Sequence, residues 1–212
     1  MTTSELVNKV KTRIDEVSAS GDTLVDVGVE NTKPYDSIIA ELLDESALEV
    51  LLKAPFYRLS VTNGSSATGV TATKDSSDEY VGTLTLPTDF IRLVSLRMKS
   101  WKQPVTTFAL PGDAVAVKQS NKYIRGGIAK PVAVLYRNST SPYAHYYSVA
   151  SASDHSVTEL LYIKKQTAAE LATASAEVVD ALCWICAGKT LGVLGEKGLA
   201  ELCYENAKGL MV

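Results

Sequence analysis

The chain has 212 residues, enough for one domain with an insertion or for two small domains. Hydrophobic residues make up 46% and charged residues 21%, which is ordinary for a globular protein. The formal net charge of −3 argues against a nucleic-acid-binding protein, because such proteins are usually basic. No apolar run reaches the roughly 18 residues that a membrane span needs, and residues 1–10 lack the apolar centre of a signal peptide. We therefore expect a chain made and kept in a cytosol.

Two helices are predicted before the first strand. Apolar residues recur at steps of three and four over residues 4–17, and again over residues 36–53, where Pro34 stands near the start and Pro55 ends the pattern. Residues 18–33 form a polar connector. The second helix carries an acidic face, which is either solvated or faces basic residues of a neighbour (Asp36, Glu41, Asp44, Glu45 and Glu49).

The middle of the chain changes to a period of two, which indicates strands. Residues 63–78 are rich in Ser, Thr, Gly and Ala and are predicted to be a long exposed hairpin tip or a mobile loop. Residues 114–119 fit one short helical turn or another strand. Short strands with polar turns favour an antiparallel sheet or small sandwich. The predicted strands are 57–62, 80–86, 91–98, 105–109, 132–136, 146–150 and 158–164.

The last quarter is helical again, with a short turn at 167–171 and helices at 175–194 and 197–211. Gly195 can end the first of these helices in a left-handed cap. The predicted fold class is α+β: a helical bundle formed by residues 1–55 and 166–212, with an inserted antiparallel β domain at 56–165.

One motif resembles the end of a phosphate-binding loop, Ala187-Gly188-Lys189-Thr190. That loop needs a glycine five residues before its Gly-Lys pair and a preceding strand. Here Cys183 occupies that position within a predicted helix, so no nucleotide site is expected. The glycines at 188, 192 and 195 are better explained as places where another helix or subunit approaches closely.

No set of residues forms a recognisable catalytic or metal site. The three cysteines (Cys183, Cys186 and Cys203) fit a reducing compartment and are expected to be small apolar core residues. His145 and His155 lie in a Ser/Tyr-rich stretch, with no nucleophile motif beside them. We expect no catalytic residue, no cofactor and no metal, and hence no enzyme.

The most distinctive stretch is YVGTLTLPTDFIRLVSLRMKSW, residues 80–101. Pro87 and Asp89 force a sharp exit from the first strand, and Phe90 is placed to plug the corner. The residues proposed for an interface are those of this corner and of the turn that follows the second strand (Leu86, Pro87, Asp89, Phe90, Arg92 and Trp101).

This stretch, together with the helix–strand–helix order, resembles the head-to-tail adaptor (connector or neck) proteins of tailed bacteriophages, of the short-tailed or crAss-like type. The resemblance implies a virion structural protein that forms a homo-oligomeric ring, commonly of twelve subunits, between portal and tail proteins. Such a ring is assembled in the host cytoplasm and contacts no membrane. A weakly acidic subunit suits a channel through which DNA passes without specific binding. Several adaptors dock through an extended C-terminal tail, whereas this sequence stops directly after its last helix, so residues 63–78 are an alternative docking arm.

Two other functions remain open at this point. The first is a β-sandwich binding module that recognises a host or glycan ligand through its Tyr-rich segments, and it predicts aromatic side chains gathered in a concave site. The second is an enzyme whose site holds His145 or His155 beside an acid.

Overall fold

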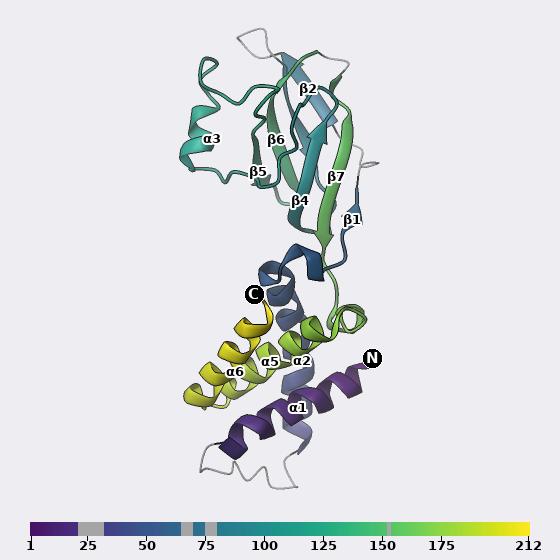
Figure 1. Ribbon diagram of the computed structural model, residues 1–212, viewed down its shortest axis with the longest axis vertical. Helices are drawn as coiled ribbons and strands as arrows, with labels where there is room; N and C mark the ends of the chain where they lie inside the picture. Colours follow the sequence, from purple (N-terminus) through teal and green to yellow (C-terminus); the bar gives the residue numbers. More distant parts are fainter. Residues whose placement is uncertain (21–31, 65–69, 75–79, 152–153) are drawn as a thin grey trace. The chain divides into compact units, whose positions relative to one another are not determined.

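The computed structural model describes residues 1–20, 32–64, 70–74, 80–151 and 154–212, and it divides the chain into two compact units. The helical unit comprises Met1–Ser60 and Lys165–Val212, and the β unit comprises Val61–Lys164. The α+β class predicted from the sequence is confirmed (Figure 1). The helical unit extends to Ser60, five residues beyond the predicted boundary at 55.

The helical unit is built around one buried helix. Eleven residues of α5 (Ala176–Val193) are buried, because α1 (Thr3–Ser20), α2 (Thr32–Lys53) and α6 (Lys197–Leu210) all pack against it (Figure 1). A helix that is apolar on all sides belongs in the interior of a bundle. The three flanking helices bury only one face each, which is why α1 and α6 show the periodic pattern that predicted them.

Local signals explain where these helices begin and end. Thr167 and Glu170 form a capping box at the start of the short helix α4 (Ala168–Leu171). Gly195 ends α5 with a φ of 89°, as the sequence predicted. Gly188 also matches its prediction: a Cβ there would lie 3.2 Å from the Ala200 carbonyl oxygen on α6. A Cβ on Gly192 would meet no described atom, so no other helix of the described chain approaches it.

The predicted strand at 57–62 is wrong over most of its length. Residues 56–58 form the 3-10 helix η2 (Phe56–Arg58), and only β1 (Thr62–Asn63) is extended and paired. Arg58 connects this segment to the end of the chain. Its guanidinium donates to the carbonyl oxygens of Leu210 and Val212, and so caps the C-terminal end of α6 with a positive charge.

The β unit consists of two antiparallel sheets (Figure 1). The three-stranded sheet has the order β1-β7-β4, with β7 (Val157–Lys164) and β4 (Phe90–Met98). The four-stranded sheet has the order β2-β3-β6-β5, with β2 (Val70–Lys74), β3 (Tyr80–Thr85), β6 (Pro142–Val149) and β5 (Ala133–Arg137). Buried residues from both sheets form one core, which includes Leu84, Leu96, Tyr146 and Leu160.

Three predictions for the β unit need correction. Residues 63–78, predicted as an exposed hairpin tip or a mobile loop, contain β2, which pairs with β3 from Val70↔Leu84 to Lys74↔Tyr80, while residues 65–69 and 75–78 lie outside the described residues. Residues 105–109 form no full strand and contribute only the isolated bridges Leu96↔Val105 and Ala109↔Val134. Strict alternation fails in β4, where register shifts place Ser95 and Leu96 on the buried side together. The remaining strands are confirmed, and residues 114–119 form the short helix α3 (Ala114–Lys118).

Candidate interaction surface

The residues proposed from the sequence for an interface divide into two groups. Leu86 and Trp101 are only 2% and 1% exposed and belong to the core of the β unit. They stabilise its interior and present no surface to a partner. The other four are half-buried around the Leu-Pro-Thr-Asp-Phe corner (Pro87, Asp89, Phe90 and Arg92).

The corner itself is a packed structural element. The backbone N–H of Phe90 donates to the carbonyl oxygen of Pro87 at 3.0 Å, which closes the turn. The Phe90 ring stacks on Tyr162 with centroids 5.8 Å apart, and the Tyr162 hydroxyl donates to Asp89 Oδ1 at 3.1 Å. Burial and the neighbouring carboxylate raise the pKa of Tyr162. The corner therefore joins β4 to β7, and its function within the chain is to stabilise the sandwich.

A more exposed surface lies in the connection between β4 and β5, residues 99–132, which we name the β4–β5 arm. Backbone hydrogen bonds hold the arm at several points, including Val105 to Leu96 and Lys102 to Ile128. Gln119, which is 3% exposed, donates to the Val115 carbonyl oxygen and accepts from the Gly126 N–H, at 2.7 and 2.9 Å. The arm is thus an ordered part of the β unit.

The β4–β5 arm exposes apolar side chains that are not buried in the core of the β unit. Helix α3, at the centre of the arm, contributes no buried residue to the core. Tyr123 is 84% exposed, and Val117 is 63% exposed. Isolated exposed apolar residues are common on any protein, but five within one connection are a feature of interaction surfaces (Leu110, Val115, Val117, Tyr123 and Ile124).

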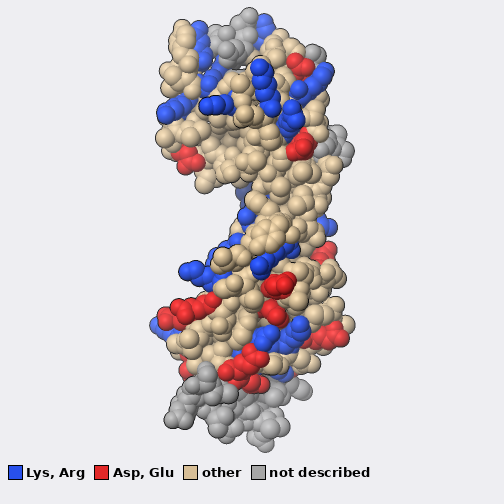
Figure 2. Space-filling model, in the orientation of Figure 1, with Lys and Arg blue, Asp and Glu red and all other residues tan. Residues whose placement is uncertain are grey.

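The arm is also strongly basic. Asp113 is its sole acidic residue, against six Lys and Arg (Lys99, Lys102, Lys118, Lys122, Arg125 and Lys130). The β unit as a whole has 11 Lys and Arg but 7 Asp and Glu, whereas the helical unit has 10 and 17. Lys and Arg predominate on the face of the β unit visible in Figure 2. The net charge of −3 conceals this difference between the units, and so the sequence prediction missed the arm. The signal that could have found it is the excess of Lys and Arg over acidic residues within residues 99–132.

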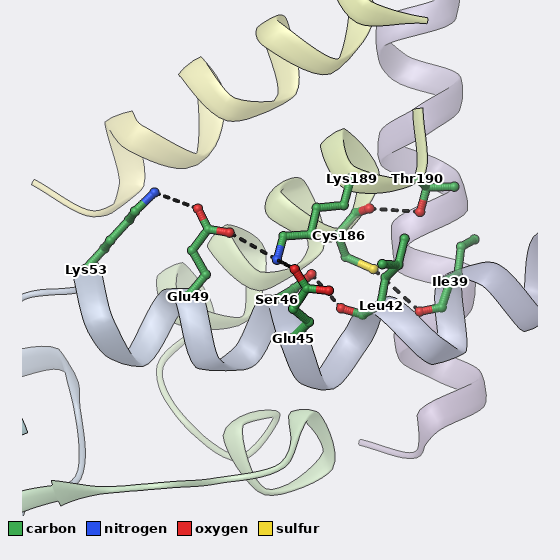
Figure 3. Close-up of polar contacts among 9 residues, drawn as sticks. All are labelled: Ile39, Leu42, Glu45, Ser46, Glu49, Lys53, Cys186, Lys189 and Thr190. Atoms are coloured by element: carbon green, nitrogen blue, oxygen red, sulfur yellow. Dashed lines mark hydrogen bonds and ion pairs between the residues drawn. The ribbon is translucent and has the colours of Figure 1, made fainter. Parts of the chain in front are cut away.

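The acidic face predicted on α2 is largely neutralised within the chain (Figure 3). Lys189 of α5 contacts Glu45 at 2.8 Å and Glu49 at 3.2 Å, and Lys53 contacts Glu49 at 2.6 Å. Burial alone would raise the pKa of Glu49, but its two lysine partners lower it overall. In the same way, burial opposes the charge of Lys189 and its carboxylate partners raise its pKa.

Two further α2 carboxylates are also engaged within the chain. Asp36 pairs with Lys11, and Asp44 accepts from the Ala168 N–H at 2.8 Å at the start of α4. Within the described residues, Glu41 alone of the five acidic side chains has no partner. The α2 face therefore mainly stabilises the helical unit.

Lys189 also settles how the Ala-Gly-Lys-Thr sequence is used. It lies within α5 and points to two carboxylates, and the buried Thr190 hydroxyl donates to the Cys186 carbonyl oxygen at 2.9 Å (Figure 3). The backbone amides here are engaged in a helix and cannot wrap a phosphate. The motif is a structural part of the bundle.

The described cysteines are buried, and each histidine contacts a tyrosine. All three cysteines are buried, as predicted, and burial raises their pKa to about 11, 12 and 11 (Cys183, Cys186 and Cys203). His155 Nδ1 lies 2.7 Å from the Tyr146 hydroxyl, and His145 Nδ1 lies 3.1 Å from that of Tyr147. Burial lowers the pKa of both histidines. Among the described residues, no group of three or more His, Cys, Asp or Glu could hold a metal ion.

A row of aromatic side chains lies on one face of the β5–β6 pair. The Tyr136 and Tyr143 rings stack with centroids 5.6 Å apart, and the His145 ring lies 4.8 Å from that of Tyr147. All four side chains are half-buried. Alternation along β6 places Tyr143, His145 and Tyr147 opposite the buried Ala144 and Tyr146. This is a second, smaller candidate surface.

Within the described ranges, no helix combines the length and hydropathy required to cross a bilayer. A scan against protein-family models finds no match to this sequence, and a search of curated proteins finds none either.

Proposed function

We propose that this chain is a non-enzymatic structural subunit of a phage virion, which forms a ring at the portal–tail junction and joins portal to tail proteins. Two lines of argument support the proposal. The first is the resemblance of residues 80–101 to head-to-tail adaptors. The second, and the observation that carries it, is the ordered β4–β5 arm, whose exposed apolar and basic side chains have no function in the core of their own unit.

An apolar side chain that stays in water, such as Val117, loses the roughly 25 cal/mol per Å² that burial would contribute. An ordered arm with five such side chains is therefore better suited to a complex than to an isolated molecule. When one surface binds a different surface of the next copy, the contact closes into a ring if the rotation allows it. The proposal includes passage of DNA without specific binding, and the helical unit, with 17 acidic and 10 basic residues, is the part of the chain suited to line that passage.

The test is the mass of the purified protein, alone and with the portal protein of the same phage. Mass photometry should detect a discrete oligomer, and electron microscopy should show annular particles. A monomer that binds neither portal nor tail proteins at micromolar concentration would refute the proposal.

The aromatic row of Tyr136, Tyr143, His145 and Tyr147 favours a second candidate function, a binding module for a host or glycan ligand. This alternative expects a monomer or trimer, and a glycan array on which binding is lost with Tyr136→Ala or Tyr143→Ala. Retention of glycan binding by both variants would exclude this surface.

A further inference from the structure

The β4–β5 arm needs a partner surface that is both acidic and apolar, because the arm combines Lys118 and Lys122 with Val117 and Tyr123. The helical unit, with 17 acidic and 10 basic residues, is the acidic part of the chain. Most α2 carboxylates are already paired with lysines or with a helix N-terminus. The free acidic surface must be sought elsewhere in the helical unit.

The outward face of α6 meets these requirements. Ala200, Cys203 and Ala207 are buried against α5, so the opposite side of the helix faces outward. On that side lie Glu201 and Glu205, which are exposed and make no ion pair with any described residue. We define the α6 outer face by five residues at steps of three and four (Gly198, Glu201, Leu202, Glu205 and Gly209).

The α6 outer face is also open and apolar at its centre. Leu202 is 46% exposed, and a Cβ added to Gly198 or Gly209 would meet no described atom within 4 Å. The two glycines therefore leave the helix backbone uncovered at two points of this face. Apolar side chains of a partner can approach the helix backbone there, while Glu201 and Glu205 stand within reach of its cations. Val193, in the last turn of α5, is also exposed.

We propose that the β4–β5 arm of one copy binds the α6 outer face of the next copy. The exposed apolar residues of the arm would cover Leu202, and Lys118 and Lys122 would pair with Glu201 and Glu205. Such a contact joins two different surfaces, so it repeats from copy to copy and closes when the rotation fits. This inference rests on the ring proposed above and specifies which surfaces build it.

The experiment reverses the charge on each surface. One variant carries Lys118→Glu with Lys122→Glu, and a second carries Glu201→Lys with Glu205→Lys. All four side chains are exposed and none makes an ion pair with a described residue, so both variants should keep wild-type circular dichroism and melting temperature. A matched control reverses Asp15 together with Lys165, two exposed residues outside both surfaces.

For each reversed variant alone, the concentration needed for half-oligomerisation should rise at least tenfold. For the control variant, this concentration should stay at the wild-type value. An equimolar mixture of the two reversed variants should regain assembly, because each reversed arm then meets a reversed α6 face on the other chain. Recovery in a single chain that carries all four changes, without recovery in the mixture, would show a contact inside one chain and overturn the proposal.

Three other results would also overturn it. If wild type assembles and both reversed variants assemble equally well, the ring is built by other surfaces and the proposed function survives. If the lysine variant assembles normally but loses salt-dependent binding to double-stranded DNA, the arm is a DNA contact. If wild type itself stays monomeric with its portal, the proposed function fails first.

A disulfide provides an independent readout. Val117→Cys and Leu202→Cys, each made in a differently tagged chain, should form an intermolecular disulfide on mild oxidation. Leu52→Cys, at a site that is also exposed, is the control that should not react with Val117→Cys. Absence of the disulfide in an assembled ring would contradict the proposed pairing.

Discussion

Replacement of Gly82 by alanine is expected to destabilise the β unit severely. The Cβ of alanine would lie 2.0 Å from the Thr71 carbonyl oxygen and 2.4 Å from the Tyr146 hydroxyl. The absence of a side chain at position 82 lets Tyr146 of β6 extend past β3 and donate to the Thr71 carbonyl oxygen on β2, at 3.0 Å. Glycine is thus required here by close approach, and three neighbouring strands depend on it.

The magnitude follows from two contributions. Overpacking a well-filled interior costs about 1–3 kcal/mol, and loss of the Tyr146–Thr71 hydrogen bond with a buried group left unpaired costs about 1–3 kcal/mol more. The sum, about 2–6 kcal/mol, should lower the melting temperature of the β unit by about 10 °C or more. Gly127→Ala in the same unit is the matched control: no described atom lies near its Cβ, so it should be neutral or stabilise by about 0.4–1 kcal/mol.

The assay uses the distribution of the two tryptophans. Trp101 lies in the β unit and Trp184 in the helical unit, so a Trp184→Phe background leaves one indole that reports on the β unit. Thermal unfolding followed by fluorescence then gives the stability of that unit. The cost of Gly82→Ala should shrink in a Tyr146→Phe background, where one clash and the hydrogen bond are both absent. Equal melting temperatures for Gly82→Ala and Gly127→Ala would refute the close approach.

Two further predictions concern the helical unit. Lys189→Met should destabilise it by about 1–3 kcal/mol, since Glu49 loses one of its cations in a partly buried site. Because the pKa of Glu49 is lowered on folding, this stabilisation is present above the unfolded pKa of about 4.3 and is lost as the pH falls through the folded pKa. Chemical denaturation of wild type and variant at pH 7 and pH 3 should therefore give a smaller difference at pH 3, and an equal difference at both pH values would contradict the ion pair. Ellman's reagent should label no thiol of the native protein at pH 8 and three thiols in denaturant (Cys183, Cys186 and Cys203). The reason is that burial raises the pKa of each cysteine to about 11 or 12. Labelling of the native protein at the denatured rate would show that the bundle is open.

The sequence predicted the helices well because their boundaries depend on local chemistry. Pro55 follows α2, Gly195 caps α5, and Thr167 begins α4, each through backbone geometry or a hydrogen bond between near neighbours. The strands of the β unit were harder to predict, because they depend on pairing between segments that are far apart in the sequence. The polar run of β2 becomes a strand because it pairs with β3, where the Thr71 and Thr83 hydroxyl groups hydrogen-bond to each other. Its Ser- and Thr-rich composition alone gave no such indication.

The candidate surface was harder to predict than the fold. Leu86 and Trp101 stand out in the sequence because they are large and next to turns, yet the same property makes them good core residues. Conversely, the apolar Val115 and Val117 lie in a segment that fitted a helical turn or a strand, and both are exposed because α3 packs none of its side chains into the core. Whether a short apolar element is buried depends on the neighbours that the fold supplies.

The insertion of the β unit into the helical unit has a consequence for the order of folding during synthesis. The β unit is continuous in the chain, so it can fold once Lys164 has left the ribosome. Helices α1 and α2 are made earlier, but their buried partner α5 emerges only after the whole β unit. Until then, the apolar faces of α1 and α2 have no α5 to pack against. We expect chaperones that recognise exposed apolar helices to bind the nascent chain during that interval.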